Sequence, residues 1–138
     1  MRRVRFHVRE AESSVAAMIR HVVMWSVRGD DAAARARNAR VVRDAFAQLR
    51  GQVPGLLALD VGIDDSRVDY ACDVVLIADF ATRAALADYA THPAHLQVRA
   101  RLGDLRSARH QVDYEVADAD SGLSDGHTIK TAGNAPAG

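Results

Sequence analysis

The sequence predicts an α+β domain with the order β-α-β-β-α-β, in which a four-stranded antiparallel sheet lies behind two helices. Three observations lead to this fold class. First, segments with period-two alternation lie near both ends of the region 18–117. Second, two longer segments place apolar residues at helical spacing. Third, a pair of apolar segments lies between the two helical segments.

The first predicted strand runs from Ile19 to Val27. Its residues, IRHVVMWSV, are largely β-branched or aromatic, which favours extended backbone. At period two, one face carries Ile19, His21, Val23, Trp25 and Val27. Val22 and Met24 make the opposite face apolar as well, so we expect both faces of this strand to be covered.

The first predicted helix covers residues 32–50. Asp30 or Asp31 is a suitable N-cap, apolar residues such as Val42 and Phe46 recur at helical spacing, and Gly51 ends the segment. The arginines of this segment alternate around the helix, which favours a solvated face over a nucleic-acid surface.

The middle of the chain predicts a pair of antiparallel strands, 56–63 and 71–80, separated by turn-forming residues at 64–66. The last predicted strand is ARHQVDYEV, residues 108–116. Apolar residues on one face of this strand, and on both faces of the first, indicate that two sheets meet in a homodimer.

Size and charge limit the classes of function. The 138 residues suit one compact domain, and 18 basic residues balance 18 acidic ones. We therefore expect no nucleic-acid partner and no membrane partner. Cys72 is the only cysteine, which excludes an internal disulfide and agrees with a cytoplasmic location.

The two ends of the chain lack the apolar pattern of the region 18–117. We expect residues 1–17 to form a mobile extension that is neither a secretory signal nor a membrane span. Residues 118–138 are expected to form a flexible tail, because they have almost no large apolar side chain to offset the entropy of ordering. His127 in this tail has no histidine or acidic cluster around it, and we do not expect it to bind metal.

The second predicted helix, within 81–105, is interrupted by the sequence HPAH. Proline pushes the residue before it out of the helical conformation, so the helix should pause near His92 and Pro93 should begin a new helical segment. His92 and Pro93 are therefore predicted to form a structural joint. His95 belongs to the apolar stripe of the new segment, which turns it toward the sheet and near Tyr89.

Tyr89 and His95 are the candidate catalytic pair. An imidazole with a pKa of about 6.5 exchanges protons near neutrality, and a tyrosine with a pKa of about 10 is a neutral hydrogen-bond donor there. Together they suit the removal of a proton from a carbon acid and the stabilisation of the resulting enolate. The alternative is a histidine that bonds to a tyrosine or a backbone carbonyl and only stabilises the helix junction.

A metal site at His92 and His95 needs a third ligand, and Asp88, His21 or Asp113 can supply it only if the fold brings them together. Two imidazoles three residues apart seldom hold zinc or iron by themselves. The sequence also has no glycine-rich phosphate loop and no nucleophile elbow. We therefore predict no metal and no cofactor.

Three pieces of the sequence, taken in order, resemble the stress-responsive A/B barrel domain (Dabb) family: MIRHVVMW, DYATHPAH and VDYEV. The resemblance runs from Met18 to Val116. It implies a ferredoxin-like monomer that dimerises through its sheet into an α/β barrel. Many family members have no assigned activity and the HPxH motif is widespread among them, so the resemblance does not assign a reaction.

One plant member type is a polyketide cyclase that closes an aldol ring, and the chain is similar to it at Tyr89, His95 and His21. In that enzyme type the tyrosine and the second histidine of the motif form the catalytic pair, and the first-strand histidine faces the pocket. The last strand departs from this pattern, because one of its faces is polar where a long alkyl substrate requires an apolar wall. That polar face carries Arg109, Gln111 and Asp113.

The resulting hypothesis is a pocket between sheet and helices, with Tyr89 and His95 as catalytic candidates and His21 and Trp25 as ligand-binding residues. The leading prediction is a homodimeric Dabb protein of unassigned activity that binds a small organic ligand. One alternative is an aldol-type polyketide cyclase or related lyase that uses no cofactor. A further alternative is a non-catalytic stress or assembly protein that uses the barrel only for association.

Overall fold

The computed structural model of the chain describes residues 17–117. The predicted N-terminal extension up to residue 16 and the predicted C-terminal tail with His127 lie outside the described residues. The elements are β1 (Met18–Val27), α2 (Ala32–Ala47), β2 (Leu56–Ile63), β3 (Val74–Phe80), α3 (Arg83–Thr91), α4 (Pro93–Leu102) and β4 (Arg106–Val116). Their order is the predicted one, with the second helix divided in two.

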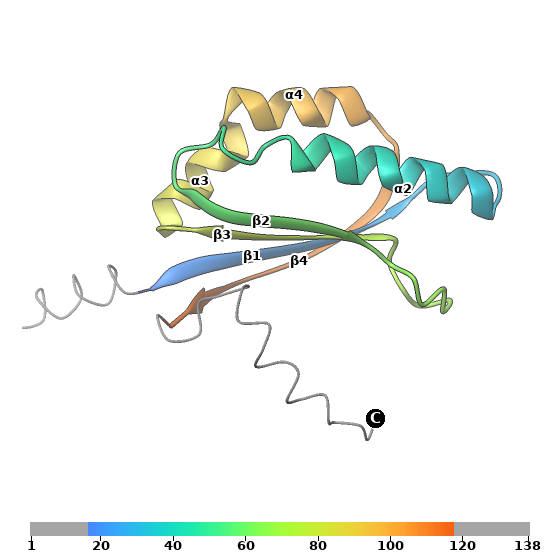
Figure 1. Cartoon of the computed structure of the whole chain (residues 1–138), viewed down its shortest axis with the longest axis horizontal. Helices are drawn as coiled ribbons and strands as arrows, with labels where there is room; N and C mark the ends of the chain where they lie inside the picture. The colour runs from blue at the N-terminus through green and yellow to red at the C-terminus, as the bar shows by residue number, and fades with distance from the viewer. Residues whose placement is uncertain (1–16, 118–138) are drawn as a thin grey trace, which may run out of the picture.

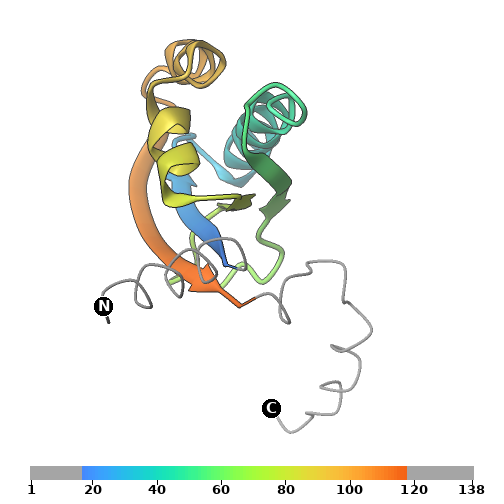
Figure 2. The ribbon, with the colours of Figure 1, turned by 90° about the vertical axis from the view of Figure 1, so that its left-hand side faces the viewer.

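The four strands form one antiparallel sheet in the order β2-β3-β1-β4, and the helices lie on one face of it (Figure 1). The view along the layers separates α2, above the β2 side of the sheet, from α3 and α4, above the β4 side (Figure 2). The predicted fold class is confirmed. No helix within residues 17–117 is long and apolar enough to cross a membrane.

β1 runs through the middle of the sheet, between β3 and β4. The residues predicted to share one face of this strand are buried beneath the helices: Ile19, His21, Val23, Trp25 and Val27. The opposite, outer face of the sheet carries exposed apolar side chains on β1 and β4, including Met24, Val112 and Tyr114. The helices therefore cover one face of the sheet and leave an apolar region on the other.

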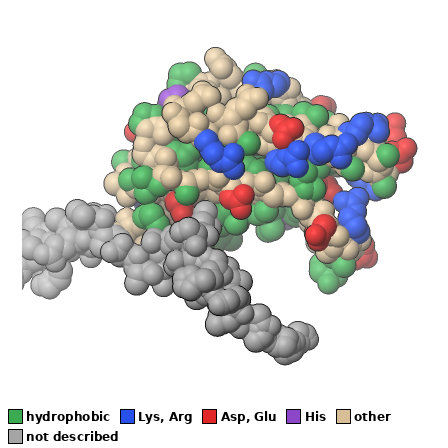
Figure 3. Space-filling model, viewed as in Figure 1, with side chains coloured by type: hydrophobic (Ala, Val, Ile, Leu, Met, Phe, Trp, Pro, Cys, Tyr) green, Lys and Arg blue, Asp and Glu red, His purple; other side chains and the backbone are tan. Residues whose placement is uncertain are grey.

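The closely packed part of the core lies between α2 and the sheet. Asp31 caps α2, because its side chain accepts a hydrogen bond from the Ala34 N–H at 2.8 Å. The core there includes Val42, Phe46, Leu49 and Leu76, all almost completely buried. Arginine side chains gather along the outer surface of α2 (Figure 3), as expected for a solvated helix face.

Gly55 lies where the chain before β2 passes close to α3. Its φ is +84°, a backbone conformation that is strained for residues with a side chain but not for glycine. A Cβ at this position would lie 2.5 Å from the Cβ of Ala85 on α3. Glycine therefore allows α3 to sit against the loop and fixes the height of this helix above the sheet.

His92 and Pro93 form the junction between α3 and α4. His92 has an extended backbone, with φ −65° and ψ 137°, and Pro93 is the first residue of α4. The Nδ1 atom of His92 accepts a hydrogen bond from the Ala94 N–H at 3.0 Å. The histidine thus satisfies a backbone donor that the start of a helix would otherwise leave open.

Candidate active site

A cavity of about 700 Å³ lies between the sheet and the α3–α4 pair. This volume is within the usual range for small-molecule sites, about 300–1,000 Å³. All four side chains that the sequence selected for a site line it: His21, Trp25, Tyr89 and His95. The polar face predicted for the last strand lines it too, through Arg109, Gln111 and Asp113.

Tyr89 and His95 stack on one another across the helix junction. Their ring centroids are 4.2 Å apart, with 29° between the ring planes. Tyr89 is only 5% exposed, and burial raises the pKa of its hydroxyl to about 12. Within residues 17–117 this hydroxyl forms no hydrogen bond. Tyr89 is therefore a protonated donor at neutral pH, with its hydroxyl available to a ligand.

The backbone of α3 determines which nitrogen of His95 carries the proton. Nδ1 lies 3.2 Å from the carbonyl oxygen of Ala90. A carbonyl oxygen only accepts, so Nδ1–H is the donor and Nε2 has a free lone pair. Burial lowers the pKa of His95, against the smaller effect of its bond to Ala90. His95 is therefore a neutral imidazole with an available basic nitrogen at neutral pH.

A second imidazole faces the same cavity from the sheet. His21 lies opposite Asp113 in the β1–β4 register, and its Nδ1 is 2.7 Å from Oδ1 of Asp113. The side chain of Gln111 donates to the other oxygen of this carboxylate at 2.9 Å. The His21 ring lies edge-on to Tyr89, with centroids 6.0 Å apart. Asp113 thus orients His21, a role that the sequence analysis did not assign to it.

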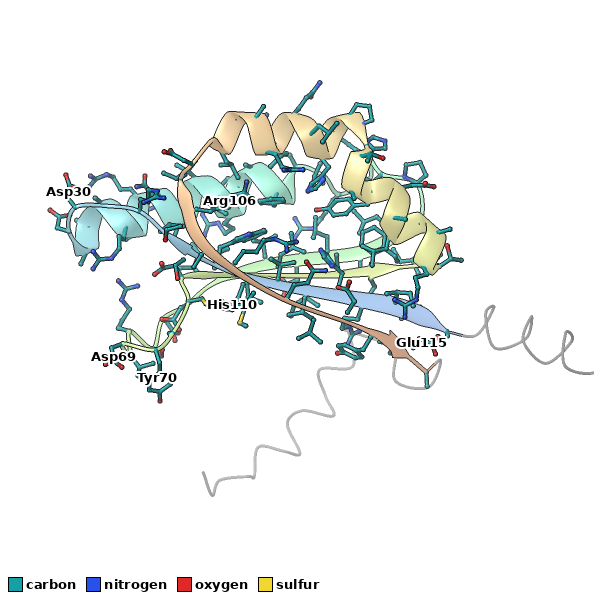
Figure 4. The ribbon with its side chains drawn as sticks, turned by 180° about the vertical axis from the view of Figure 1, so that it is seen from behind. Asp30, Asp69, Tyr70, Arg106, His110 and Glu115 are labelled. Atoms are coloured by element: carbon teal, nitrogen blue, oxygen red, sulfur yellow. The ribbon has the colours of Figure 1, made fainter. Side chains whose placement is uncertain are left out.

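Arg106 is a cavity residue that the sequence analysis did not select. If side chains alternated regularly back from Arg109, which lines the cavity, Arg106 would lie on the outer face of β4. The β1–β4 register shifts between Ser26 and Val27, and this irregularity places Arg106 opposite the buried Val27. Arg106 therefore lies on the helix side of the sheet (Figure 4). Nothing in the alternation of the sequence signals this bulge.

Trp25 forms part of the cavity wall beneath Arg106. Its ring stacks on Phe46, with centroids 4.6 Å apart, and the guanidinium carbon of Arg106 is 5.3 Å from its centre. The indole Nε1–H is buried and has no hydrogen-bond partner within residues 17–117. Buried donors normally have a partner, so this indole is an exception among the described residues.

His92 lies apart from this arrangement, because its Nδ1 is occupied by the cap of α4 and it does not line the cavity. Asp113, one of the possible third metal ligands, forms hydrogen bonds with His21 and Gln111 instead. Across the described part of the chain, no three His, Cys, Asp or Glu side chains gather as a metal site requires.

The fold and cavity define the class of protein: a small ferredoxin-like α+β domain with a ligand-sized space between its sheet and one pair of helices. The chain belongs to the stress responsive A/B barrel domain (Dabb) family, whose model matches residues 19–116. The predicted family is therefore confirmed. No protein with a curated description matches the sequence.

Solved structures of the same fold include a dimeric protein of unknown function from Bacteroides fragilis NCTC 9343. It is 23% identical, with a TM-score of 0.64 over 72% of this chain and 96% of that chain. The hydroxynitrile lyase from Passiflora edulis is 11% identical, with a TM-score of 0.60 over 73% of this chain and 94% of its own. SnoaB from Streptomyces nogalater, a cofactor-independent oxygenase, is 20% identical, with a TM-score of 0.52 over 70% and 90%.

Proposed function

We propose that this domain binds a small organic molecule in the cavity between the sheet and the α3–α4 pair. The observation that carries the proposal is the convergence of polar groups on a cavity of about 700 Å³ with aromatic walls. The Tyr89 hydroxyl and Nε2 of His95 have no hydrogen-bond partner within residues 17–117, and the Trp25 ring forms part of the wall beside them. Such sites combine a mostly apolar wall with a few polar groups that fix orientation.

Cofactor-independent acid–base chemistry is the second candidate, and the protonation states of Tyr89 and His95 favour it. In this scheme Nε2 of His95 takes a proton from a carbon beside a carbonyl group. The Tyr89 hydroxyl donates a hydrogen bond to the carbonyl oxygen as that oxygen gains negative charge. The protonated His95 then returns the proton to the carbon or gives it to a leaving group. An aldol-type cyclase or a lyase uses these same steps.

Two of the structurally similar proteins support the idea that this fold accommodates small-molecule chemistry. One is named as a hydroxynitrile lyase and the other as a cofactor-independent oxygenase. At 11% and 20% identity their likeness extends to the fold alone. The candidate reaction for this chain therefore depends on its own Tyr89 and His95.

Proton exchange at carbon tests the catalytic candidate. Phenylacetone and phenylpyruvate, one neutral and one anionic carbon acid, are incubated with the protein in D₂O, and loss of the proton signal beside the carbonyl is followed by NMR. We expect acceleration of at least one of them. His95→Gln should lower the acceleration by about 10²–10⁴-fold, and Tyr89→Phe by about 10²–10³-fold.

The control for that experiment is His110→Gln, since His110 is exposed and lies opposite Met24 on the outer side of the sheet. It should exchange both compounds at the rate of the unmodified protein. Exchange that survives in His95→Gln would assign any acceleration to another group. Ligand binding at Trp25 without exchange of either compound would leave the binding function and remove the catalytic one.

We also propose that the outer face of the sheet pairs with a second copy of the chain. Met24, Val112 and Tyr114 are 39%, 59% and 44% exposed on that face, and the structure from Bacteroides fragilis is described as dimeric. Light scattering at micromolar concentration should give the mass of a dimer, and Val112→Asp should give a monomer. Val41→Asp, at an exposed position on α2, is the matched control. A dimer without any ligand would favour the assembly alternative.

A further inference from the structure

We infer that the ligand of this cavity is a small aromatic carboxylate, whose charged group is held by the arginines of the cavity wall beside Trp25. The inference rests on the proposed function, since it names the substrate class of the same cavity. It depends on charge, on the donors left without acceptors, and on the rings that line the wall.

Positive charge exceeds negative charge around the cavity. Of the described residues, three arginines line it, Arg99 from α4 with Arg106 and Arg109 from β4, whereas Asp113 is the single carboxylate. Asp113 already accepts from His21 and Gln111. Among residues 17–117 none of the three arginines forms an ion pair with a carboxylate. The cavity therefore has cations whose counter-charge the described protein does not supply.

Arg106 has the strongest need for an anion. Its guanidinium lies over two rings, 5.3 Å from the centre of Trp25 and 5.5 Å from that of Phe46. Burial lowers the pKa of Arg106, and the positive charges of Arg99 and Arg109 lower it further. Contact with rings replaces only part of the lost hydration of a cation. A carboxylate at this place would oppose both effects.

The Arg106 guanidinium only donates, and its N–H groups lie in one plane. A ligand group that meets it must therefore accept several hydrogen bonds at once. A carboxylate does so, because its two oxygens can bind the guanidinium side by side. The Trp25 Nε1–H is itself buried, so this ring contributes packing to the wall and no hydrogen bond to the ligand.

The walls nearest these donors indicate an aromatic body for the ligand. Trp25 and Phe46 stack at one part of the wall, and Tyr89 and His95 stack at another. Flat rings pack on such walls with more contact area than flexible chains and lose little rotamer freedom. The polar residues of β4, Arg109 among them, replace the apolar wall that a long alkyl chain would need.

A pair of ligands that differ only in charge tests the inference. The probes are 2-naphthoate and 2-naphthamide, which have the same ring system and nearly the same shape. Trp25 is the only tryptophan of the chain, so a single indole N–H signal in the ¹H–¹⁵N spectrum reports on the cavity. We expect naphthoate to shift this signal and to bind about tenfold or more tightly than naphthamide. Added salt should weaken naphthoate alone.

Arginine variants then locate the anion site. Arg106→Gln should reduce the preference for naphthoate to about threefold or less, since the bidentate donor is lost. Arg109→Gln is a second variant at an exposed position, which keeps the test valid if Arg106→Gln does not fold. The matched control is Arg101→Gln, because Arg101 lies on α4 like Arg99 but does not line the cavity.

Each outcome separates the inference from the proposed function. Equal binding of the two probes would overturn the anionic ligand and leave a cavity that binds organic molecules. No shift of the Trp25 signal with either probe would overturn both proposals. An equal loss in Arg101→Gln and Arg106→Gln would show that surface charge, not the cavity, attracts the anion, and would also overturn the inference.

Discussion

Arg20 and His21 are consecutive residues of β1, and each bonds to the carboxylate directly opposite it on a neighbouring strand. Arg20 lies opposite Asp79 of β3, and its Nε and Nη2 donate to the two carboxylate oxygens at 2.8 and 3.0 Å. His21 lies opposite Asp113 of β4, with 2.7 Å between Nδ1 and Oδ1. Because side chains alternate along a strand, the first pair faces outward and the second faces the cavity.

The two pairs differ in chemistry although the same register rule forms them. Asp79 is 2% exposed, and the hydrogen bonds that it accepts from Arg20 raise the pKa of that arginine, so Arg20 stays charged. The inner pair joins the imidazole of His21 to the carboxylate of Asp113, which is 23% exposed at the cavity. One face of β1 thus holds a bidentate arginine–carboxylate pair, and the other holds an imidazole–carboxylate pair that a ligand in the cavity can approach.

Breaking the outer pair should have the largest effect on folding. Arg20→Met leaves the buried Asp79 carboxylate without its cation, and we expect a loss of about 3–5 kcal/mol in the free energy of unfolding. The measurement is urea denaturation at pH 7. Arg20→Met with Asp79→Leu removes both charges and should recover most of the loss. A loss in the single variant as small as that of a typical surface substitution would show that Asp79 finds another partner.

Breaking the inner pair should cost less stability and change the chemistry more. Asp113→Asn removes a charged hydrogen-bond acceptor from a partly exposed site, for which we expect a loss of about 1 kcal/mol. An asparagine can present its N–H₂ to Nδ1 of His21, so the ring proton can move to Nε2. The ¹⁵N shifts of the His21 ring report this change directly. Unchanged ring shifts would mean that Asp113 does not select the tautomer.

The smallest expected effect is the response of His95 to pH. Burial lowers its pKa in the folded protein below the ordinary value of 6.5. The unfolded chain therefore takes up a proton first as pH falls. The contribution of neutral His95 to the free energy of unfolding is fully present above about pH 6.5 and decreases as pH falls through the lowered pKa. The urea midpoint should fall less between pH 7.5 and 5.5 in His95→Gln than in the unmodified protein. An identical decrease in both would contradict the lowered pKa.

Much of this arrangement follows from local sequence rules. Alternation alone places His21 and Trp25 on one face of β1, and the structure buries both on that face. Proline restricts the residue before it, so the division of the second helix at Pro93 also follows from the chain. The antiparallel pair of middle strands follows from two apolar segments around a turn. These features depend on residues close together in the sequence.

The parts that sequence reasoning missed depend on contacts between distant residues. Asp113 orients His21 because β4 pairs with β1 in one particular register, which alternation by itself does not set. Arg106 faces the cavity because a bulge reverses the side-chain pattern at the start of β4. The expected strand began at residue 108, so it excluded Arg106 altogether. The sequence did predict the polar face at 109–113. It did not predict the excess of positive charge around the cavity, because that excess includes Arg106.

The extended backbone of one residue, His92, decides whether Tyr89 and His95 meet at all. On an uninterrupted helix, positions six residues apart lie about 120° apart around the axis and about 9 Å apart along it, on different sides. In the folded chain the rings are instead 4.2 Å apart. The pairing is therefore encoded by the path of the backbone more than by the two side chains. Transplanting only the tyrosine and histidine to a straight helix of another protein would fail, whereas moving the whole corner from 89 to 95 would carry the pair with it.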